Sequence, residues 1–219
     1  MTVTMDELNL IQKIIVWSVP VLLAITVHEV AHGWTAKHRG DPTAMMLGRL
    51  TLNPLKHIDP IGTIVVPGLL LFLQASFIFG WAKPVPVTWQ NLKHPKRDMA
   101  LVAIAGPAAN LIMAILWAIL AKIGAALFQY LGDSVLLLIY MGWAGASINI
   151  ALMVLNLLPI PPLDGGRVLV GLLPTPWAWH VNRIEPYGLF IVIGLLVMGI
   201  LQSILIFVYE KFLWIFGLS

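Results

Sequence analysis

Residues 11–36 read IQKIIVWSVPVLLAITVHEVAHGWTA, and this stretch sets the class of the protein. Between residues 16 and 27 only Ser18 and Thr26 are polar, so the run is apolar enough to cross a lipid bilayer as a helix. This run is followed at once by His28-Glu29-Val30-Ala31-His32, which places three ionisable side chains on the same helix. The stretch therefore predicts a membrane helix that carries a chemical site.

The pattern His-Glu-x-x-His is typical of a zinc site on a helix. Because a helix turns once every 3.6 residues, His28 and His32 lie one above the other on one face. Two neutral imidazoles in that arrangement bind Zn²⁺, and the adjacent glutamate accepts a proton from the attacking water. We expect His28 and His32 to be ligands and Glu29 to be the general base. The alternative is a structural polar cluster, but ionisable groups at a membrane-helix centre each cost about 2.5–3.5 kcal/mol.

Zinc in a catalytic site needs a third protein ligand, with a further position left for water. The chain has no cysteine, so a histidine or a carboxylate has to supply it. Asp164 is the best candidate, because it follows a proline-broken stretch (residues 156–162) and its backbone is free to bend inward. The alternative is that Asp164 caps a short helix beginning near Gly165.

Two asparagines lie in apolar spans, where an amide needs a hydrogen-bond partner. Asn110 closes the small-residue stretch Gly-Pro-Ala-Ala-Asn, and Asn156 lies eight residues before Asp164. Each amide either bonds a neighbouring helix or donates to the oxyanion that forms during peptide hydrolysis. We assign Asn156 to catalysis because of Asp164, and count Asn110 as a further catalytic candidate with both interpretations open.

The composition indicates a membrane protein. Of 219 residues, 59% are hydrophobic and only 11% are charged, whereas a soluble domain has about a quarter charged residues. The small net charge of +3 comes from basic residues scattered in short loops, so no nucleic-acid partner is expected. Asp6 and Glu7 replace a basic leader region, so no cleaved signal peptide is expected. We expect one domain over residues 1–219, with its core at 8–170 and C-terminal spans at 186–217.

The expected fold class is an all-α polytopic membrane protein with about four to five transmembrane helices. Residues 58–79 are apolar but interrupted by Pro60 and Pro67, so they either cross the membrane or re-enter it. Residues 83–88, Lys-Pro-Val-Pro-Val-Thr, are expected to form a short extended or β segment near the active site, which either pairs with substrate or acts as a spacer. Apolar runs predict spans at 8–37, 99–130, 135–158 and 187–216. The last run forms one helix or two.

Charge distinguishes the two paths of residues 58–79. If the segment crosses, ten basic residues are divided four to six between the two sides. If it re-enters, the same ten of thirteen lie together, on the side that the positive-inside rule makes the cytoplasm. We favour re-entry, with the site opening to the cytoplasm. The ten residues are Lys37, Arg39, Arg49, Lys56, Lys83, Lys93, Lys96, Arg97, Arg167 and Arg183.

The chain resembles the site-2 proteases, a family of intramembrane zinc metalloproteases, in the order of three motifs. These are residues 28–32 (HEVAH), 106–110 (GPAAN) and the stretch from Asn156 through Pro159 to Leu163-Asp164-Gly165. The resemblance implies one bound Zn²⁺, and it is closest to the minimal branch without PDZ or CBS domains. The implied ligands are His28, His32 and Asp164, the catalytic glutamate is Glu29, and the asparagines beside the metal are Asn110 and Asn156.

The same resemblance implies an activity and a setting. Members of the family hydrolyse peptide bonds within or near transmembrane segments, so transmembrane proteins are the expected substrates and the bilayer the expected surroundings. We expect an integral protein of a bacterial inner membrane, with its oligomeric state open. A zinc or cation transporter using the same cluster is the alternative, although the far halves of the spans lack a continuous polar path. A prenyl-protein protease is less favoured, because residues 99–158 contain no histidine or glutamate.

Overall fold

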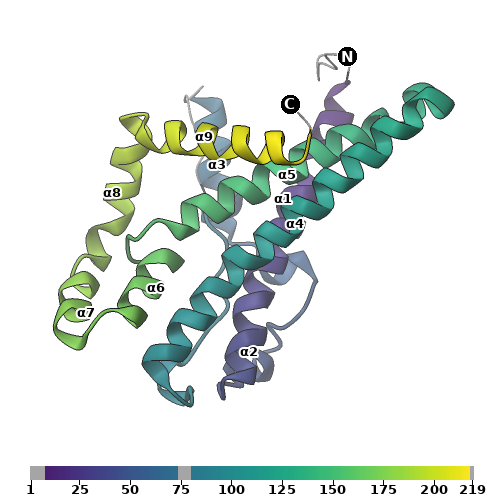
Figure 1. Ribbon diagram of the computed structural model, residues 1–219. Coiled ribbons are helices and arrows are strands. Elements are labelled where there is room, and N and C mark those ends of the chain that lie inside the picture. Colours follow the sequence, from purple (N-terminus) through teal and green to yellow (C-terminus); the bar gives the residue numbers. More distant parts are fainter. Residues whose placement is uncertain (1–7, 74–79, 218–219) are drawn as a thin grey trace.

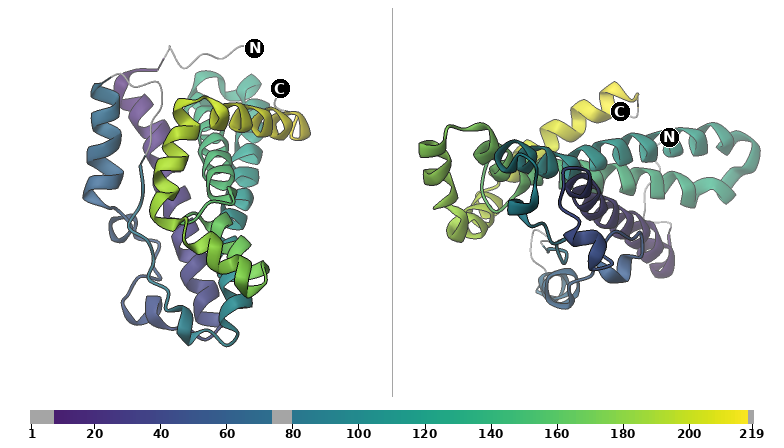
Figure 2. Two further views of the ribbon diagram at one scale, coloured as in Figure 1. Left: turned by 90° about the vertical axis from the view of Figure 1, so that its left-hand side faces the viewer. Right: turned by 90° about the horizontal axis from the view of Figure 1, so that it is seen from below.

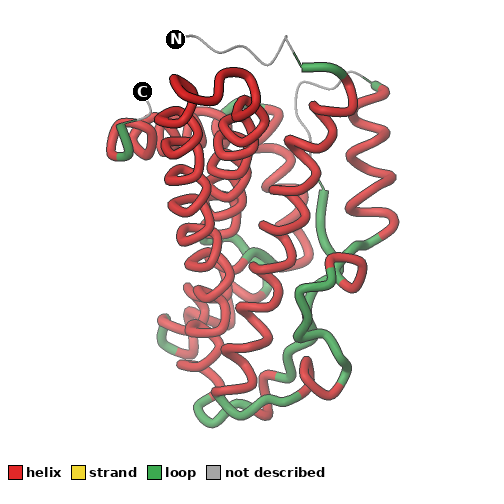
Figure 3. Tube along the Cα trace, turned by 90° about the vertical axis from the view of Figure 1, so that its right-hand side faces the viewer, coloured by secondary structure: helices red, strands yellow, loops and turns green. Residues whose placement is uncertain are grey.

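The computed structural model describes residues 8–73 and 80–217, and within them every regular element is a helix (Figure 3). The expected all-α class is confirmed. Three long helices, α1, α4 and α5, form the centre of the molecule (Figure 1). The helices are α1 (Leu10–His38), α2 (Thr43–Met46), α3 (Val66–Phe72), α4 (Pro95–Leu131), α5 (Leu136–Leu157), α6 (Asp164–Leu172), α7 (Thr175–Asn182), α8 (Glu185–Val197) and α9 (Ile200–Ile215). A π-helical turn, η3 (Pro60–Val65), leads into α3, and short 3₁₀ turns are η2 (Pro54–Lys56), η4 (Trp89–Asn91) and η5 (Gly132–Val135).

Helix α1 begins and ends at local signals in the sequence. The Asn9 side chain accepts from the Gln12 backbone N–H, and the Gln12 side chain accepts from that of Asn9, which together satisfy two free N–H groups. The helix continues through Pro20 and stops just before Gly40, whose φ of +111° favours glycine. The histidine motif therefore lies in the second half of one continuous helix.

Helices α4 and α5 form an antiparallel hairpin joined by η5 (Figure 1). Small residues line the seam: a Cβ at Gly142 would lie 2.7 Å from the Cβ of Ala121, and one at Gly145 would lie 2.2 Å from the ring of Trp117. Membrane helices use such residues to bring their backbones close together. This hairpin forms the wall against which α1 packs.

The chain between His57 and Lys83 returns to where it started. The Lys83 N–H donates to His57 O at 3.0 Å, and the Trp81 N–H donates to Gly62 O at 3.1 Å. The helical part, residues 60–72, lies beside α1, and the extended residues 80–88 run back along it (Figure 2). Within the described residues this extended segment pairs with no strand, and residues 74–79 of the predicted re-entrant segment lie outside the described residues.

The last apolar run consists of two helices. Gly199, with a φ of +74°, separates α8 from α9, and α9 turns away from α8 to pack against the side of the α4–α5 hairpin (Figure 1). Helix α8 has 13 residues, or about 20 Å of length, and is too short to cross a bilayer core of about 30 Å alone. Among the described residues, the stretches long and apolar enough to span are Leu10–His38 and Pro95–Leu157, with a third possible where α7 and α8 meet at 64°.

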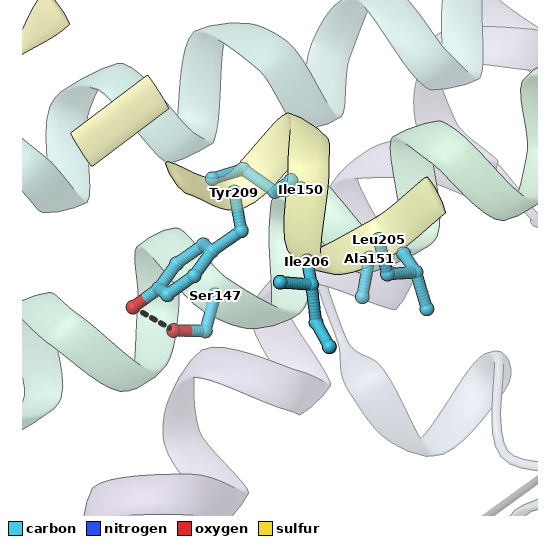
Figure 4. A pocket seen from close by; sticks show the side chains of 6 residues that line it. All are labelled: Ser147, Ile150, Ala151, Leu205, Ile206 and Tyr209. Atoms are coloured by element: carbon cyan, nitrogen blue, oxygen red, sulfur yellow. Dashed lines mark hydrogen bonds between the residues drawn. The ribbon is translucent and has the colours of Figure 1, made fainter. Parts of the chain in front are cut away.

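A shallow apolar hollow of about 170 Å³ lies between α5 and α9 (Figure 4). Its polar contact joins the Ser147 and Tyr209 hydroxyls at 2.9 Å. The Tyr209 hydroxyl is the donor, because the single proton of Ser147 goes to the Trp143 carbonyl at 2.7 Å. Its lining includes none of the candidate metal ligands, so the hollow is separate from the metal centre. The lining residues are Ser147, Ile150, Ala151, Leu205, Ile206 and Tyr209.

Candidate metal centre

Three side chains meet where α1 passes the first turn of α6. The Nε2 atoms of His28 and His32 are 3.0 Å apart, and Asp164 Oδ2 lies 3.2 Å from each of them. About a tenth of each side chain is exposed, so the cluster is almost enclosed. The structure thus brings together the two histidines predicted to share a helix face and the carboxylate predicted to join them from a distant segment.

The outer nitrogen of each imidazole is bound to a hydrogen-bond acceptor. His32 Nδ1 lies 2.7 Å from the carbonyl oxygen of Val102, which can only accept, so Nδ1 carries the proton. His28 Nδ1 lies 2.6 Å from Asn110 Oδ1. The Asn110 amide nitrogen donates to Asn149 Oδ1 at 2.9 Å, which leaves its oxygen facing His28. Both neutral imidazoles therefore direct the lone pair of Nε2 into the cluster.

This arrangement is suited to a cation. Two Nε2 lone pairs converge on the Asp164 carboxylate, and no described residue donates a hydrogen bond to its buried Oδ2 atom. Three acceptors at this distance repel one another unless a positive charge lies among them. Ligands about 2.0–2.1 Å from a tetrahedral Zn²⁺ lie about 3.3 Å from one another, close to the distances found here. The residues present therefore fit one zinc ion.

Asp164 reaches the cluster because the chain turns sharply after α5. Helix α6 begins at Asp164 itself, and its N-cap is Leu163, which makes no side-chain cap. The carboxylate faces the histidines, so the interpretation of Asp164 as a capping residue is wrong. Gly165 makes the turn possible, because a Cβ there would lie 2.3 Å from the carbonyl oxygen of Leu157.

Glu29 is adjacent to the first ligand along α1 and is only partly buried. One of its carboxylate oxygens, Oε2, accepts the backbone N–H of Val85 at 2.6 Å. Val85 belongs to the extended residues 80–88, so this segment does lie at the predicted site. No described residue donates to the other carboxylate oxygen, so its lone pairs can accept from a water molecule.

The two predicted asparagines have different surroundings. Asn110 is fully buried and directly contacts His28. Asn156 is partly buried, and its amide nitrogen donates to the Leu152 carbonyl of its own helix at 2.9 Å. The assignment of Asn156 to catalysis therefore stays a prediction.

Two further residues support the cluster: Asn149, which sequence reasoning missed, and Gly106, which belongs to the predicted motif at 106–110 but whose contact was not predicted. Asn149 is fully buried, accepts from Asn110 and donates to the Gly145 carbonyl at 2.8 Å. Gly106 faces the imidazoles: a Cβ there would lie only 2.4 Å from His32 Nε2. A buried amide in an apolar span was a signal for Asn149, as it was for Asn110, whereas nothing in the sequence shows which helix Gly106 approaches.

Asp41 anchors the extended segment just beyond α1. Its buried carboxylate accepts the Thr88 N–H at 2.7 Å and the Asn91 side-chain amide at 3.1 Å, and it also bonds the backbone and hydroxyl of Thr43. Burial raises the pKa of Asp41, but the hydrogen bonds from Thr43, Thr88 and Asn91 together lower it by more than burial raises it. The pKa of Asp41 therefore lies below its ordinary value. The carboxylate is therefore ionised at neutral pH.

Comparisons with known proteins agree with this chemistry. A family model described as "Peptidase family M50" matches residues 127–199, which include Asn156 and Asp164. "Putative zinc metalloprotease YwhC" of Bacillus subtilis (strain 168) is 38% identical over 186 residues, covering 82% of this chain and 78% of that protein. "Putative zinc metalloprotease Rip2" of Mycolicibacterium smegmatis is 31% identical over 199 residues, covering 90% of this chain and 71% of that protein. No solved structure matches.

The similarity is not confined to the metal motif, because both relatives align with more than four fifths of this chain. The transporter alternative finds no support among these relatives, which are named as proteases. The ligand set, the buried cluster and the relatives all lead to the same conclusion: the chain belongs to peptidase family M50, the site-2 protease family that its motifs resemble.

Proposed function

We propose that the protein is an intramembrane zinc endopeptidase that hydrolyses peptide bonds within or near transmembrane segments of other membrane proteins. The observation that carries this proposal is the convergence of His28, His32 and Asp164, with unprotonated ligand atoms 3.0–3.2 Å apart among long apolar helices. A glutamate next to the first ligand adds the base that hydrolysis requires. A transporter site has no need of such a base.

The roles of the residues follow from their positions. Zn²⁺ bound by the cluster supplies Lewis-acid activation of water and of the scissile carbonyl. Glu29 accepts the proton of the attacking water and returns it to the nitrogen of the leaving amine. Asn110 holds His28 in the tautomer that leaves Nε2 free. The Asn156 amide has a second N–H besides the one bound to Leu152, and we assign it to the oxyanion that develops on the carbonyl.

The proposed placement in the membrane is a single domain over residues 1–219, with about four to five spans and residues 58–79 re-entering. The hydrogen bond between Lys83 and His57 supports re-entry, because it brings the start and end of that segment to the same level. Re-entry collects ten of the thirteen basic residues on one side, which we take as the cytoplasm. The site then opens to the cytoplasmic face of a bacterial inner membrane.

A transmembrane peptide cleaved by the wild-type enzyme in proteoliposomes tests the proposal. Glu29→Gln is expected to keep one zinc per chain and to lose cleavage by about 10²–10⁴-fold, the usual contribution of a general base. Asp164→Ala is expected to lose zinc. Glu185→Gln, at an exposed glutamate of α8, is the control for the substitution and should cleave normally. Cleavage by Glu29→Gln at the control rate would refute the role of Glu29.

A further inference from the structure

The contact between Glu29 and Val85 joins the site to a segment outside the metal cluster. The backbone N–H of Val85 donates to Glu29 Oε2 at 2.6 Å, and the Val85 side chain is 7% exposed. A hydrogen bond to a carboxylate is charge-assisted and roughly twice as strong as one between neutral groups. One oxygen of the general base is therefore tied to the backbone, while the other stays available.

This N–H belongs to the extended residues 80–88. Hydrogen bonds hold that segment to the rest of the protein both before and after Val85. Before it, the Lys83 N–H donates to His57 O at 3.0 Å, and the Arg49 guanidinium donates to the Lys83 carbonyl at 2.9 Å. After it, the Thr88 N–H donates to the buried Asp41 carboxylate at 2.7 Å. The anchors on His57 and Asp41 lie on residues that are at most 1% exposed, so the segment is an integral part of the fold.

Gly33 allows the segment to come this close to α1. It lies one helical turn after Glu29, on the same face. A Cβ at Gly33 would lie 2.8 Å from Val85 Cγ1 and 2.6 Å from Leu50 Cδ2, both closer than van der Waals contact. The missing side chain therefore sets the distance at which the Val85 N–H reaches Glu29.

The segment is poorly suited to pair with a substrate strand, which was one interpretation of its sequence. Proline at positions 84 and 86 has no N–H, and the N–H groups of residues 83, 85 and 88 are bound to the protein itself. Within the described part of the chain only Val87 among residues 83–88 has an N–H without a partner. Because a β-ladder needs donors on alternate residues, the function of this segment lies elsewhere.

We propose that the backbone N–H of Val85 positions the general base: it fixes the Glu29 carboxylate so that its second oxygen meets the attacking water. The proposal rests on the proposed function of Glu29. Val85 itself contacts no reacting atom, so it is a positioning residue. An inhibitory plug would have to leave the site in each turnover, and that would break the buried anchors on His57 and Asp41.

Removal of the N–H tests the proposal. Val85→Pro deletes the donor and keeps an extended backbone, because Val85 already lies between Pro84 and Pro86. We expect kcat to fall at least tenfold, towards the roughly 100-fold loss that a 1 Å misplacement produces, with KM within twofold and zinc content unchanged. Val87→Pro is the matched control: it deletes an unpartnered N–H two residues away and is expected to keep its kcat.

Two further variants isolate the hydrogen bond. Val85→Ala loses side-chain packing but keeps the N–H, so its kcat should exceed that of Val85→Pro by about tenfold or more. If Val85→Pro fails to hold zinc, an amide-to-ester replacement at Val85, which keeps the side chain, gives the deciding kcat. Equal kcat for the N–H-deleted and N–H-retaining variants, or a gain in activity, would overturn the inference. With Glu29→Gln inactive in the same assay, that result leaves the proposed function intact.

Discussion

A methyl group added at Gly106 should weaken metal binding without unfolding the protein. A Cβ added there would lie 2.4 Å from His32 Nε2 and 2.6 Å from His28 Cε1. Carbon and nitrogen atoms in contact normally lie about 3.5 Å apart, so Gly106→Ala requires a displacement of about 1 Å. The imidazoles cannot simply rotate away, because Val102 and Asn110 hold their outer nitrogens.

The size of the effect follows from that displacement. Sites of this kind tolerate misplacement of only about 0.5 Å, and the new methyl group would also take space next to the ligand atom. Loss of partners that merely orient a ligand costs about 10–100-fold in metal affinity. We therefore expect Gly106→Ala to weaken zinc binding by at least 100-fold, or about 2.7 kcal/mol, and to abolish cleavage.

Competition with a chromophoric chelator on the purified protein measures the zinc affinity, and thermal unfolding with chelator present measures the stability of the metal-free fold. Gly124→Ala is the control, because it adds the same methyl group on the same helix, 2.7 Å from Ile139 Cγ1 and away from the imidazoles. It should keep wild-type zinc affinity. A zinc affinity for Gly106→Ala within threefold of wild type would refute the packing argument.

Two other predictions concern groups that no ligand motif identifies. Asn149→Ala removes the acceptor of the Asn110 amide, so Asn110 holds His28 less firmly. Zinc affinity should therefore fall about tenfold in the same competition assay. Unchanged affinity would show that Asn110 needs no support from Asn149. Asp41 has a folded pKa below its unfolded value, so its stabilisation is fully present above the unfolded pKa, near pH 4, and is lost as the pH falls through the folded pKa. Below about pH 4 the melting temperature of the wild type should therefore fall more steeply than that of Asp41→Asn, and parallel curves would contradict this assignment.

Much of the metal centre was predictable because two of its three candidate ligands are close together in the sequence. His28 and His32 are one turn apart on a helix that the apolar run predicts, and the structure places both in a single continuous α1. Asp164 was chosen because the chain has no cysteine and because the proline-broken stretch before it leaves its backbone free to bend inward. Its alternative as a helix cap failed only when the structure showed that the carboxylate faces the histidines.

The supporting contacts were not predictable in the same way. Asn149 meets Asn110 only because α4 and α5 are antiparallel and their small residues bring the backbones close. The Val85 N–H is a backbone group, so no side chain marks its role, and its contact with Glu29 spans 56 residues. Residues 187–216 were expected to form one helix or two, and the left-handed backbone at Gly199 divides them.

The sequence by itself determined whatever depends on neighbours along the chain. Hydrophobicity makes α1 a membrane helix, the 3.6-residue repeat pairs the two histidines, and the composition limits the remaining ligand to a carboxylate or imidazole. Only the tertiary structure decided whether Asp164 joins the cluster or caps a helix, which amide orients His28 and which N–H reaches Glu29. Each of these contacts joins distant segments, and its length depends on how closely glycines allow the backbones to approach.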